Sequence, residues 1–365
     1  MACDYFSLAH SGVQSLQPYQ PGKPVDELER ELGISDIIKL ASNENPLGPA
    51  ESVCKALVGV MAELSRYPDG NGFLLKQALE QKLKIKTNQI TLGNGSNDVL
   101  DLLARAFAGP GKEVVFSEYA FAVYPIVTLA VNATPVVVPA HEWGNDLEGM
   151  AKAITSKTAL IFLANPNNPT GTYFDKGSFE AFMDEVPPRV VVVLDEAYFE
   201  YVKKDDYPSG LSYMNSYPNL VVTRTFSKAY GLAGLRVGYG VSNPDIADLL
   251  NRVRQPFNVS IPSILAAKAV LNDEAYLQRS TETNRQGLAQ LEQGLSRLGL
   301  EYIPSVGNFI TANFGSDAAD INQRLLQLGV IVRPVANYKM PAFLRISVGL
   351  AAENERFLSA LKRCL

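Results

Sequence analysis

Histidine is scarce in this sequence. Only His10 and His141 occur among 365 residues, and they are far apart along the chain. Histidine is the commonest transition-metal ligand and the usual base of a Ser-His-Asp triad, so its scarcity argues against a histidine-based metal site and against that class of hydrolase. We therefore expect no metal, and we expect another side chain to carry any acid–base chemistry.

Cysteine is equally rare. Cys3, Cys54 and Cys364 are odd in number, widely spaced and lack a C-x-x-C pair. This pattern predicts neither a disulfide framework nor a zinc cluster. We interpret the three as packing residues or inert surface thiols, which fits a reducing compartment.

Long runs of one character are also missing. The 33 basic and 38 acidic residues are interspersed and give a net charge of −5, so no basic stretch could follow a nucleic-acid backbone. No apolar run approaches the ~18 residues of a membrane helix, and the N-terminus MACDYFSLAH does not resemble a signal peptide. We expect a cytoplasmic protein that binds small molecules, and neither nucleic acid nor membrane.

Short β-branched apolar runs do occur, and they alternate with helical patterns. Hydrophobic residues make up 47% of the chain, enough for one large core or two moderate ones. Near-continuous apolar strands separated by helices predict an α/β fold with a mostly parallel, seven-stranded sheet flanked by helices. The expected strands are 89–92, 113–117, 134–138, 159–163, 190–194, 220–224 and 236–241. The clearest helix is 96–107, which Ser96 or Asn97 could cap.

The pattern changes after residue 241 to long helical segments and then to shorter strands. We expect helices over 244–254 and 262–298, and strands near 308–314, 329–333 and 343–348. These predict a smaller α+β domain. Prolines between 18 and 24 predict an extended arm with a short helix at 25–32, of a kind that often packs on a neighbour. The expected division is an arm at 1–36, a large domain at 37–257 and a small domain at 258–365.

Polar segments directly follow four of the predicted strands. In open α/β sheets, ligands bind beyond the carboxyl ends of the strands, so these segments are the first candidates for a site. They are GNGS at 93–96, NPNNPTG at 165–171, DEAY at 195–198 and TFSK at 225–228.

Each segment also has an ordinary structural interpretation. The glycine-rich turn at 93–96 opens a helix, which suits a phosphate, but most such turns are only structural, and this one is neither a Walker A loop nor a G-x-G-x-x-G motif. Asp195 could bind a protonated pyridine nitrogen, or it could cap a helix or pair with an arginine. Lys228 is flanked by Ser227 and followed by Arg236, which favours an amine beside a phosphate site over a surface lysine.

In this order, the strings NPNNPTG, DEAY and TFSK, with Arg236 in GLAGLRVGY, resemble the motifs of fold-type-I pyridoxal-phosphate-dependent aminotransferases. Within that class the chain resembles the histidinol-phosphate aminotransferase family from residue 18 to about residue 357. The strings concerned are KLASNENPLGP (39–49), RYPDG (66–70), GNGSND (93–98), SKAYGLAGLRVGYG (227–240) and LRISVG (344–349). The resemblance implies a ping-pong transaminase of histidine biosynthesis that uses L-glutamate/2-oxoglutarate and histidinol phosphate.

The resemblance also implies how the cofactor, pyridoxal 5′-phosphate, is held. Lys228 would carry it as a Schiff base and then act as the base in catalysis, and Asp195 would bind the pyridine nitrogen. Asn165 and Tyr198 would contact the ring oxygen, and Phe121 would stack on the ring. The implied phosphate contacts are Gly95, Ser96, Ser227, Arg236 and, from the other subunit of a homodimer, Tyr67.

For the substrate, the resemblance implies that Arg345 receives both the carboxylate of glutamate and the phosphate of histidinol phosphate. Tyr19 and Arg333 would add phosphate contacts, with Asn165 beside them. Taken singly, Tyr19 or Arg333 would more often be a packed aromatic or a surface ion pair. Two departures from the family pattern bear on selectivity: Lys339 stands where relatives often have glycine, and the segment 260–263 (SIPS) replaces an Asn-Ser pair.

Three other functions stay open from the sequence. An aromatic amino acid aminotransferase would use the same reaction, and a threonine-phosphate decarboxylase would use the same scaffold with a different bond broken. A cofactor-binding regulator would need a DNA-binding segment, and no basic helix-turn-helix pattern is visible.

Overall fold

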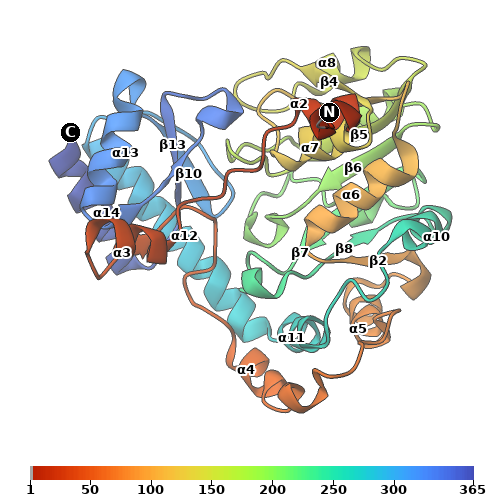
Figure 1. Ribbon diagram of the computed structural model, residues 1–365, viewed down its shortest axis with the longest axis horizontal. Coiled ribbons are helices and arrows are strands. Elements are labelled where there is room, and N and C mark those ends of the chain that lie inside the picture. Colours follow the sequence, from red (N-terminus) through yellow and green to blue (C-terminus); the bar gives the residue numbers. More distant parts are fainter. Residues whose placement is uncertain (1–2) are drawn as a thin grey trace.

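A large mixed sheet forms the centre of the fold, as a computed structural model of residues 3–365 describes it (Figure 1). The strand order is β2-β8-β7-β6-β5-β3-β4, with β8 antiparallel to both neighbours and the other pairs parallel. All seven predicted strands are confirmed to within two residues. They are β2 (Ile90–Gly93), β3 (Glu113–Ser117), β4 (Thr134–Val138), β5 (Thr158–Ala164), β6 (Val191–Asp195), β7 (Leu220–Thr225) and β8 (Gly238–Val241).

Both faces of the central strands of this sheet are buried, because their side chains point alternately to two sides that are each covered by helices. Val191 and Val193 of β6 pack towards α6 (Ser96–Phe107), α7 (Val123–Ala130) and α10 (Pro244–Val253). Val192 and Leu194 pack towards α8 (Leu147–Lys152) and α9 (Lys176–Glu185). The continuous apolar character of the strands therefore reflects burial on two sides.

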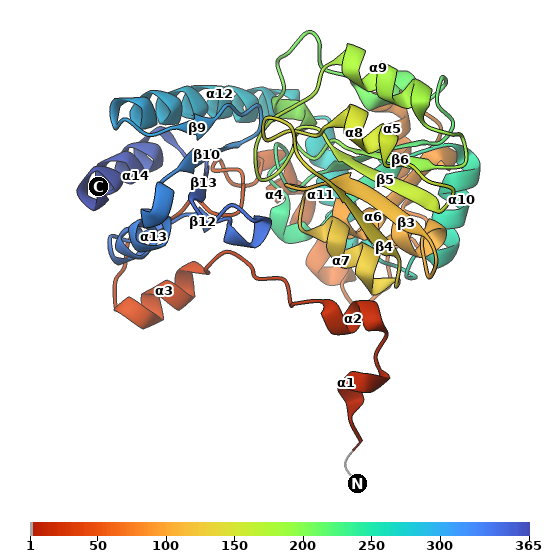
Figure 2. The same cartoon turned by 90° about the horizontal axis from the view of Figure 1, so that it is seen from above.

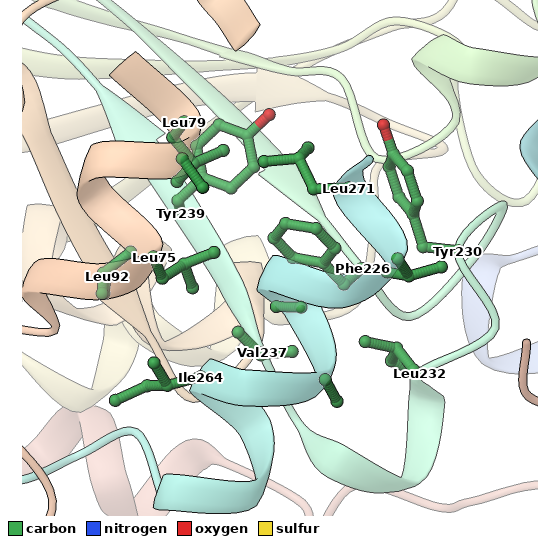
Figure 3. Packing of buried hydrophobic residues seen from close by; sticks show 14 of the residues in the cluster. Leu75, Leu79, Leu92, Phe226, Tyr230, Leu232, Val237, Tyr239, Ile264 and Leu271 are labelled. Atoms are coloured by element: carbon green, nitrogen blue, oxygen red, sulfur yellow. The ribbon is translucent and has the colours of Figure 1, made fainter. Parts of the chain in front are cut away.

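A further core anchors the segment that follows β7. Figure 3 shows Phe226 surrounded by Val237, Leu271 and Tyr230, and its side chain is fully buried. The same cluster includes residues of α4 (Glu51–Leu57), α5 (Phe73–Leu83) and α11 (Ile261–Leu271). Because Phe226 is fixed in this core, the next two residues, Ser227 and Lys228, are directed to the edge of the sheet.

A four-stranded antiparallel sheet lies in the C-terminal part, in the order β12-β13-β10-β9. Its strands are β9 (Tyr302–Ile303), β10 (Phe309–Asn313), β12 (Arg333–Pro334) and β13 (Phe343–Ser347). Its core is shared with α12 (Glu274–Arg297), α13 (Ala318–Gln327) and α14 (Ala351–Cys364). Two expectations needed correction here. The helix predicted at 262–298 is broken before α12, where the Asp273 carboxylate accepts from the N–H of Tyr276, and the strand predicted at 329–333 is divided into β11 (Val330–Ile331) and β12.

The chain before the large sheet is extended, as predicted, and includes short helices. They are α1 (Tyr5–Leu8), α2 (Ser11–Ser15) and α3 (Val25–Leu32), the last matching the predicted helix. Gly12 packs so closely on α7 that a Cβ there would lie 2.1 Å from the carbonyl oxygen of Leu129. Beyond it, α1 projects away from the rest of the chain (Figure 2).

The domain boundaries stay predictions. Just after the predicted arm, β1 (Ile38–Lys39) pairs in parallel with β11. This pairing favours assigning residues 37–40 to the C-terminal part. No helix within residues 3–365 is long and apolar enough to cross a membrane.

Candidate active site

A cavity of about 200 Å³ lies at the carboxyl ends of the large-sheet strands, next to the small sheet. Most of the predicted site residues line it, although they come from segments more than 300 residues apart. They are Tyr19, Ser96, Phe121, Asp195, Tyr198, Ser227, Lys228, Arg236, Arg333 and Arg345. The parallel strands bring these segments together at a single edge, as expected for an open α/β sheet.

Asp195 ends β6, and the residue is 4% exposed. Its Oδ2 accepts from the Tyr124 hydroxyl at 2.9 Å, and its Oδ1 accepts from Thr223 Oγ1 at 3.0 Å. Burial raises the pKa of Asp195 to about 6, against the opposing effect of these hydrogen bonds. The neighbouring Glu196, and not Asp195, pairs with an arginine: Arg224 Nη2 lies 2.7 Å from its Oε2. A cationic ligand in the cavity would therefore suit the Asp195 carboxylate.

Lys228 is held against the cavity wall by a single hydrogen bond. Its Nζ donates to the Ser42 carbonyl at 3.2 Å and lies 5.7 Å from the centre of the Tyr198 ring. Burial, aided by the positive charge of Arg345, lowers the pKa of Lys228 to about 7. An amine that loses its proton near neutral pH is a competent nucleophile and base.

The Tyr198 hydroxyl accepts two amide hydrogen bonds. Asn43 Nδ2 donates to it at 3.0 Å and Asn168 Nδ2 at 3.2 Å. Burial raises the pKa of Tyr198 to about 12, so the hydroxyl keeps its proton at neutral pH. With its acceptor sites in use, Tyr198 is left to donate its own proton to a cavity ligand.

Asn165 does not reach the cavity, which contradicts the contacts predicted for it. Its Nδ2 donates to the Phe174 carbonyl at 3.2 Å, and its Oδ1 accepts from the Phe174 N–H at 3.1 Å. Both polar groups of the side chain are thus used to close the loop after β5. Asn168, three residues later in the same NPNNPTG string, lines the cavity instead.

One end of the cavity is a cradle formed by the start of α6, Ser227 and Arg236. Arg236 Nη1 donates to Ser227 Oγ at 3.1 Å. Gly95, with φ +83°, is the N-cap of α6 in place of the predicted Ser96 or Asn97. A Cβ at Gly95 would lie 2.4 Å from Arg236 Nη2, and one at Gly238 would lie 2.4 Å from the Ser96 nitrogen. The two glycines therefore allow backbone N–H groups and the guanidinium to converge, as anion binding requires.

Two buried arginines lie at the other side, on paired strands. Arg333 and Arg345 are cross-strand partners, 7% and 6% exposed. Arg345 donates to Asn168 Oδ1 at 2.5 Å and to the Ala41 carbonyl at 3.0 Å, while its buried Nε has no partner among residues 3–365. Arg333 donates to the Gln20 carbonyl at 2.5 Å and lies over the Tyr19 ring at 5.9 Å. Neither forms a salt bridge within residues 3–365. Buried cations without a carboxylate partner indicate a binding site for an anion.

Like Asn165, Tyr67 and the two departures from the family pattern lie outside the cavity wall. Tyr67 is 81% exposed and stacks on Phe257, with ring centres 4.7 Å apart. Lys339 has φ +61°, a conformation that glycine adopts freely, and its Nζ lies 3.7 Å from Glu118. Ser260 accepts from the N–H of Ser263 as the N-cap of α11. Neither departure from the family pattern thus changes the cavity wall of this chain.

Several cavity neighbours were missed by the sequence reasoning. Asn43, with φ +54°, lies inside the quoted string KLASNENPLGP, which could have indicated it. Tyr338 lines the cavity beside the two arginines, and Tyr124 bonds to Asp195 from behind it. Neither lies in a string that signals chemistry, so only the fold reveals them.

A family model described as "Aminotransferase class I and II" matches residues 35–361. The chain belongs to this aminotransferase family. It is 57% identical to "Histidinol-phosphate aminotransferase 2" of Pseudomonas fluorescens (strain Pf0-1), over 100% of this chain and 99% of the relative. It is 54% identical to "Histidinol-phosphate aminotransferase 1" of Mannheimia succiniciproducens, over 99% of each.

Among solved structures, this aminotransferase is similar to histidinol-phosphate aminotransferase from Sinorhizobium meliloti in complex with pyridoxal-5′-phosphate. The TM-score is 0.89 at 32% identity, over 97% of this chain and 96% of that one. A Thermus thermophilus aspartate aminotransferase shares the fold, with a TM-score of 0.83 at 22% identity, over 98% and 99% of the two chains. The predicted fold class and family are confirmed.

The buried carboxyl of Asp195 gives a testable pH dependence. Its folded-state pKa is raised from 3.8 to about 6, so its contribution to stability is lost as the pH rises through about 6. We expect Asp195→Asn to stabilise the ligand-free protein above pH 6, by at most about 3 kcal/mol from the size of the shift. Melting temperatures between pH 4 and pH 8 measure this. The exposed Asp205→Asn is the control, and identical pH profiles for wild type and Asp195→Asn would contradict the assignment.

Proposed function

We propose that this chain is a histidinol-phosphate aminotransferase. It would transfer an amino group reversibly between L-histidinol phosphate and 2-oxoglutarate by a ping-pong mechanism with pyridoxal 5′-phosphate. The observation that carries the proposal is one cavity that joins a buried carboxylate, a partly buried amine, an anion cradle and two buried arginines without a salt-bridge partner among residues 3–365. The 57% identity to a full-length relative of that name supports the choice of substrate.

The cavity residues fit the cofactor. The cradle of Ser96, Ser227 and Arg236 suits its phosphate, with Gly95 leaving room for the Arg236 guanidinium. Asp195 suits a protonated pyridine nitrogen, since its carboxylate has no cationic partner. Phe121 lines the cavity and would stack on the ring.

Bound in this cavity, the cofactor would supply an aldehyde for the substrate amine and a ring that accepts electrons from the substrate Cα. Lys228 would first bind it through Nζ, then take the proton from Cα and return it to the cofactor's C4′. Asp195 would hold the proton on the pyridine nitrogen. Tyr198 would donate to the ring oxygen, with Asn168 in the place first given to Asn165.

The arginine pair would bind both substrates. Arg345 has a buried Nε without a partner in the described part of the chain, and it would receive the carboxylate of glutamate in one half-reaction and the phosphate of histidinol phosphate in the other. Arg333 and Tyr19 would add contacts to the phosphate. A planar guanidinium fork can pair with either anion, so one site serves two ligands.

The active unit would be a homodimer in which Tyr67 reaches the phosphate cradle of the partner. The stretch of chain around Tyr67, residues 58–74, has several exposed large apolar side chains, of the kind that a partner subunit would cover. The others are Val58, Met61, Leu64, Phe73 and Leu74, and Tyr5, Phe6 and Leu8 are exposed on α1. We propose the cytoplasm as its compartment, since Cys3, Cys54 and Cys364 are free thiols.

Lys228→Ala tests the cofactor assignment. Borohydride should fix pyridoxal 5′-phosphate covalently to the wild type and not to this variant, because the attacking amine is gone. Turnover should fall at least about 10³-fold with the loss of both nucleophile and base. Lys339→Ala, at an exposed lysine outside the cavity, is the matched control. Covalent fixation of the cofactor in Lys228→Ala would rule out the assignment.

A substrate panel tests the reaction. The wild type should convert histidinol phosphate with 2-oxoglutarate. Arg333→Gln should raise KM for histidinol phosphate about 10- to 100-fold, the size of a lost charge-assisted hydrogen bond, and raise KM for glutamate much less. No turnover of histidinol phosphate alongside good turnover of phenylalanine or tyrosine would instead identify an aromatic aminotransferase. Release of carbon dioxide from threonine phosphate would identify a decarboxylase.

Hybrid dimers test the Tyr67 contact. Lys228→Ala is inactive, and Tyr67→Ala should bind the cofactor weakly because one phosphate contact is lost. If Tyr67 acts across the interface, a mixed dimer has one site in which both residues are intact. We expect co-refolded subunits to regain the activity of one wild-type site per mixed dimer. Activity no higher than the sum of the separate variants would show that Tyr67 does not act in trans.

A further inference from the structure

Tyr124 lies in the first turn of α7, behind the cavity wall. Its side chain is fully buried and packs face to face on Phe162 of β5, with ring centres 4.6 Å apart and an interplanar angle of 10°. Phe121 packs edge-on against the Tyr124 ring, with ring centres 5.9 Å apart and an interplanar angle of 88°. The ring is thereby fixed, and its hydroxyl donates to Asp195 Oδ2 at 2.9 Å.

We infer that Tyr124, together with Thr223, is a positioning residue that holds the Asp195 carboxylate as a charged acceptor facing the cofactor's pyridine nitrogen. The inference rests on the function proposed above. It adds a residue from outside the cavity wall to the set on which the reaction depends.

The first argument is electrostatic. Asp195 is buried beside a second carboxylate, Glu196, whose charge is balanced by Arg224. Asp195 itself is supported by two hydroxyl groups and the N–H of Ala197. An ionised carboxylate only accepts hydrogen bonds, so donors favour the charged form over the neutral one. Without them, burial would leave a neutral carboxyl group, which stabilises a pyridinium N–H poorly.

Tyr124 is suited to remain a donor. Burial and the negative charge of Asp195 raise the pKa of Tyr124 well above its usual value, so the phenol keeps its proton. The other titratable groups that face Asp195 are Glu196, Tyr198 and Tyr207, which act through space. Among these groups, Tyr124 makes the direct hydrogen bond.

The second argument is geometric. Tyr124 bonds to Oδ2 and Thr223 to Oδ1, so the two donors fix the rotation of the carboxylate and leave its remaining lone pairs for the cavity. Phe121, three residues before Tyr124, lines the cavity itself. One short stretch of chain thus places both the ring-stacking side chain and the donor that orients Asp195.

Removing each donor with nearly unchanged shape tests the inference. In Tyr124→Phe, titration of the cofactor-free enzyme with pyridoxal 5′-phosphate should show binding weakened about tenfold, as expected for one charge-assisted hydrogen bond. The pH at which Asp195 destabilises the cofactor-free protein should also move upward from about 6. Thr223→Val should change both readouts in the same direction, and it serves as the second variant if Tyr124→Phe folds poorly.

Tyr207→Phe is the matched control. It removes another buried tyrosine hydroxyl, which donates to the Asn165 carbonyl at 2.5 Å and not to Asp195. Cofactor affinity and pH profile should stay within about twofold of wild type if the bond to Asp195 is what matters.

A double-mutant cycle separates positioning from mere packing. In an Asp195→Asn background, where there is no charge to support, Tyr124→Phe should change cofactor affinity less than about twofold. Equal losses in both backgrounds, or wild-type affinity and pH profile in Tyr124→Phe, would overturn the inference. Failure of the wild type to bind pyridoxal 5′-phosphate would overturn the proposed function instead, so the two outcomes are distinguishable.

Discussion

The constraint that shapes this site is that charged side chains lie around one cavity without an oppositely charged partner among the described residues. Around one cavity Asp195, Arg333 and Arg345 are buried and Lys228 is partly buried, and none of the four forms a salt bridge within residues 3–365. Each is supported only by neutral donors or acceptors, such as the Ser42 carbonyl or the Tyr124 hydroxyl. Such an arrangement is costly in the free protein and becomes favourable when ligands supply the missing charges.

The fold permits this because the sheet holds the charged groups while apolar cores hold the sheet. Phe226 is anchored in a core that leaves Lys228 at the sheet edge, and β6 is buried on both faces up to Asp195. Glycines at 95 and 238 allow α6 to approach Arg236 more closely than any other residue type would. The apolar packing thus offsets the free-energy cost of burying charged side chains around the cavity.

The large sheet could be predicted from the sequence, because strands buried on both faces are continuously apolar. The C-terminal part was harder. Its short strands β1, β9 and β11 have two residues each, too few for a periodic pattern, and α13 and α14 were not predicted. The break between α11 and α12 depends on one capping aspartate within a long helical pattern.

Which side chain faces the cavity could be predicted where a motif contains one residue of the required type, and was ambiguous where the motif contains several. Lys228 and Asp195 are single in their strings, and both line the cavity. NPNNPTG contains three asparagines. Because a loop has no regular repeat, the sequence does not tell which of them points into the cavity. The choice is made by Phe174, whose backbone engages Asn165 and leaves Asn168 free to face Tyr198. In the sequence, Tyr124 has the surroundings of an ordinary core aromatic, since its neighbours are apolar and no motif includes it.

Residues 41 to 43 connect these observations mechanically. The Ala41 carbonyl accepts from Arg345, the Ser42 carbonyl accepts from Lys228, and the Asn43 amide donates to Tyr198. The segment continues directly from β1, which is paired with β11. A shift of β1 and β11 relative to the large sheet would therefore disturb the contacts of three cavity side chains together, because one short segment touches all of them.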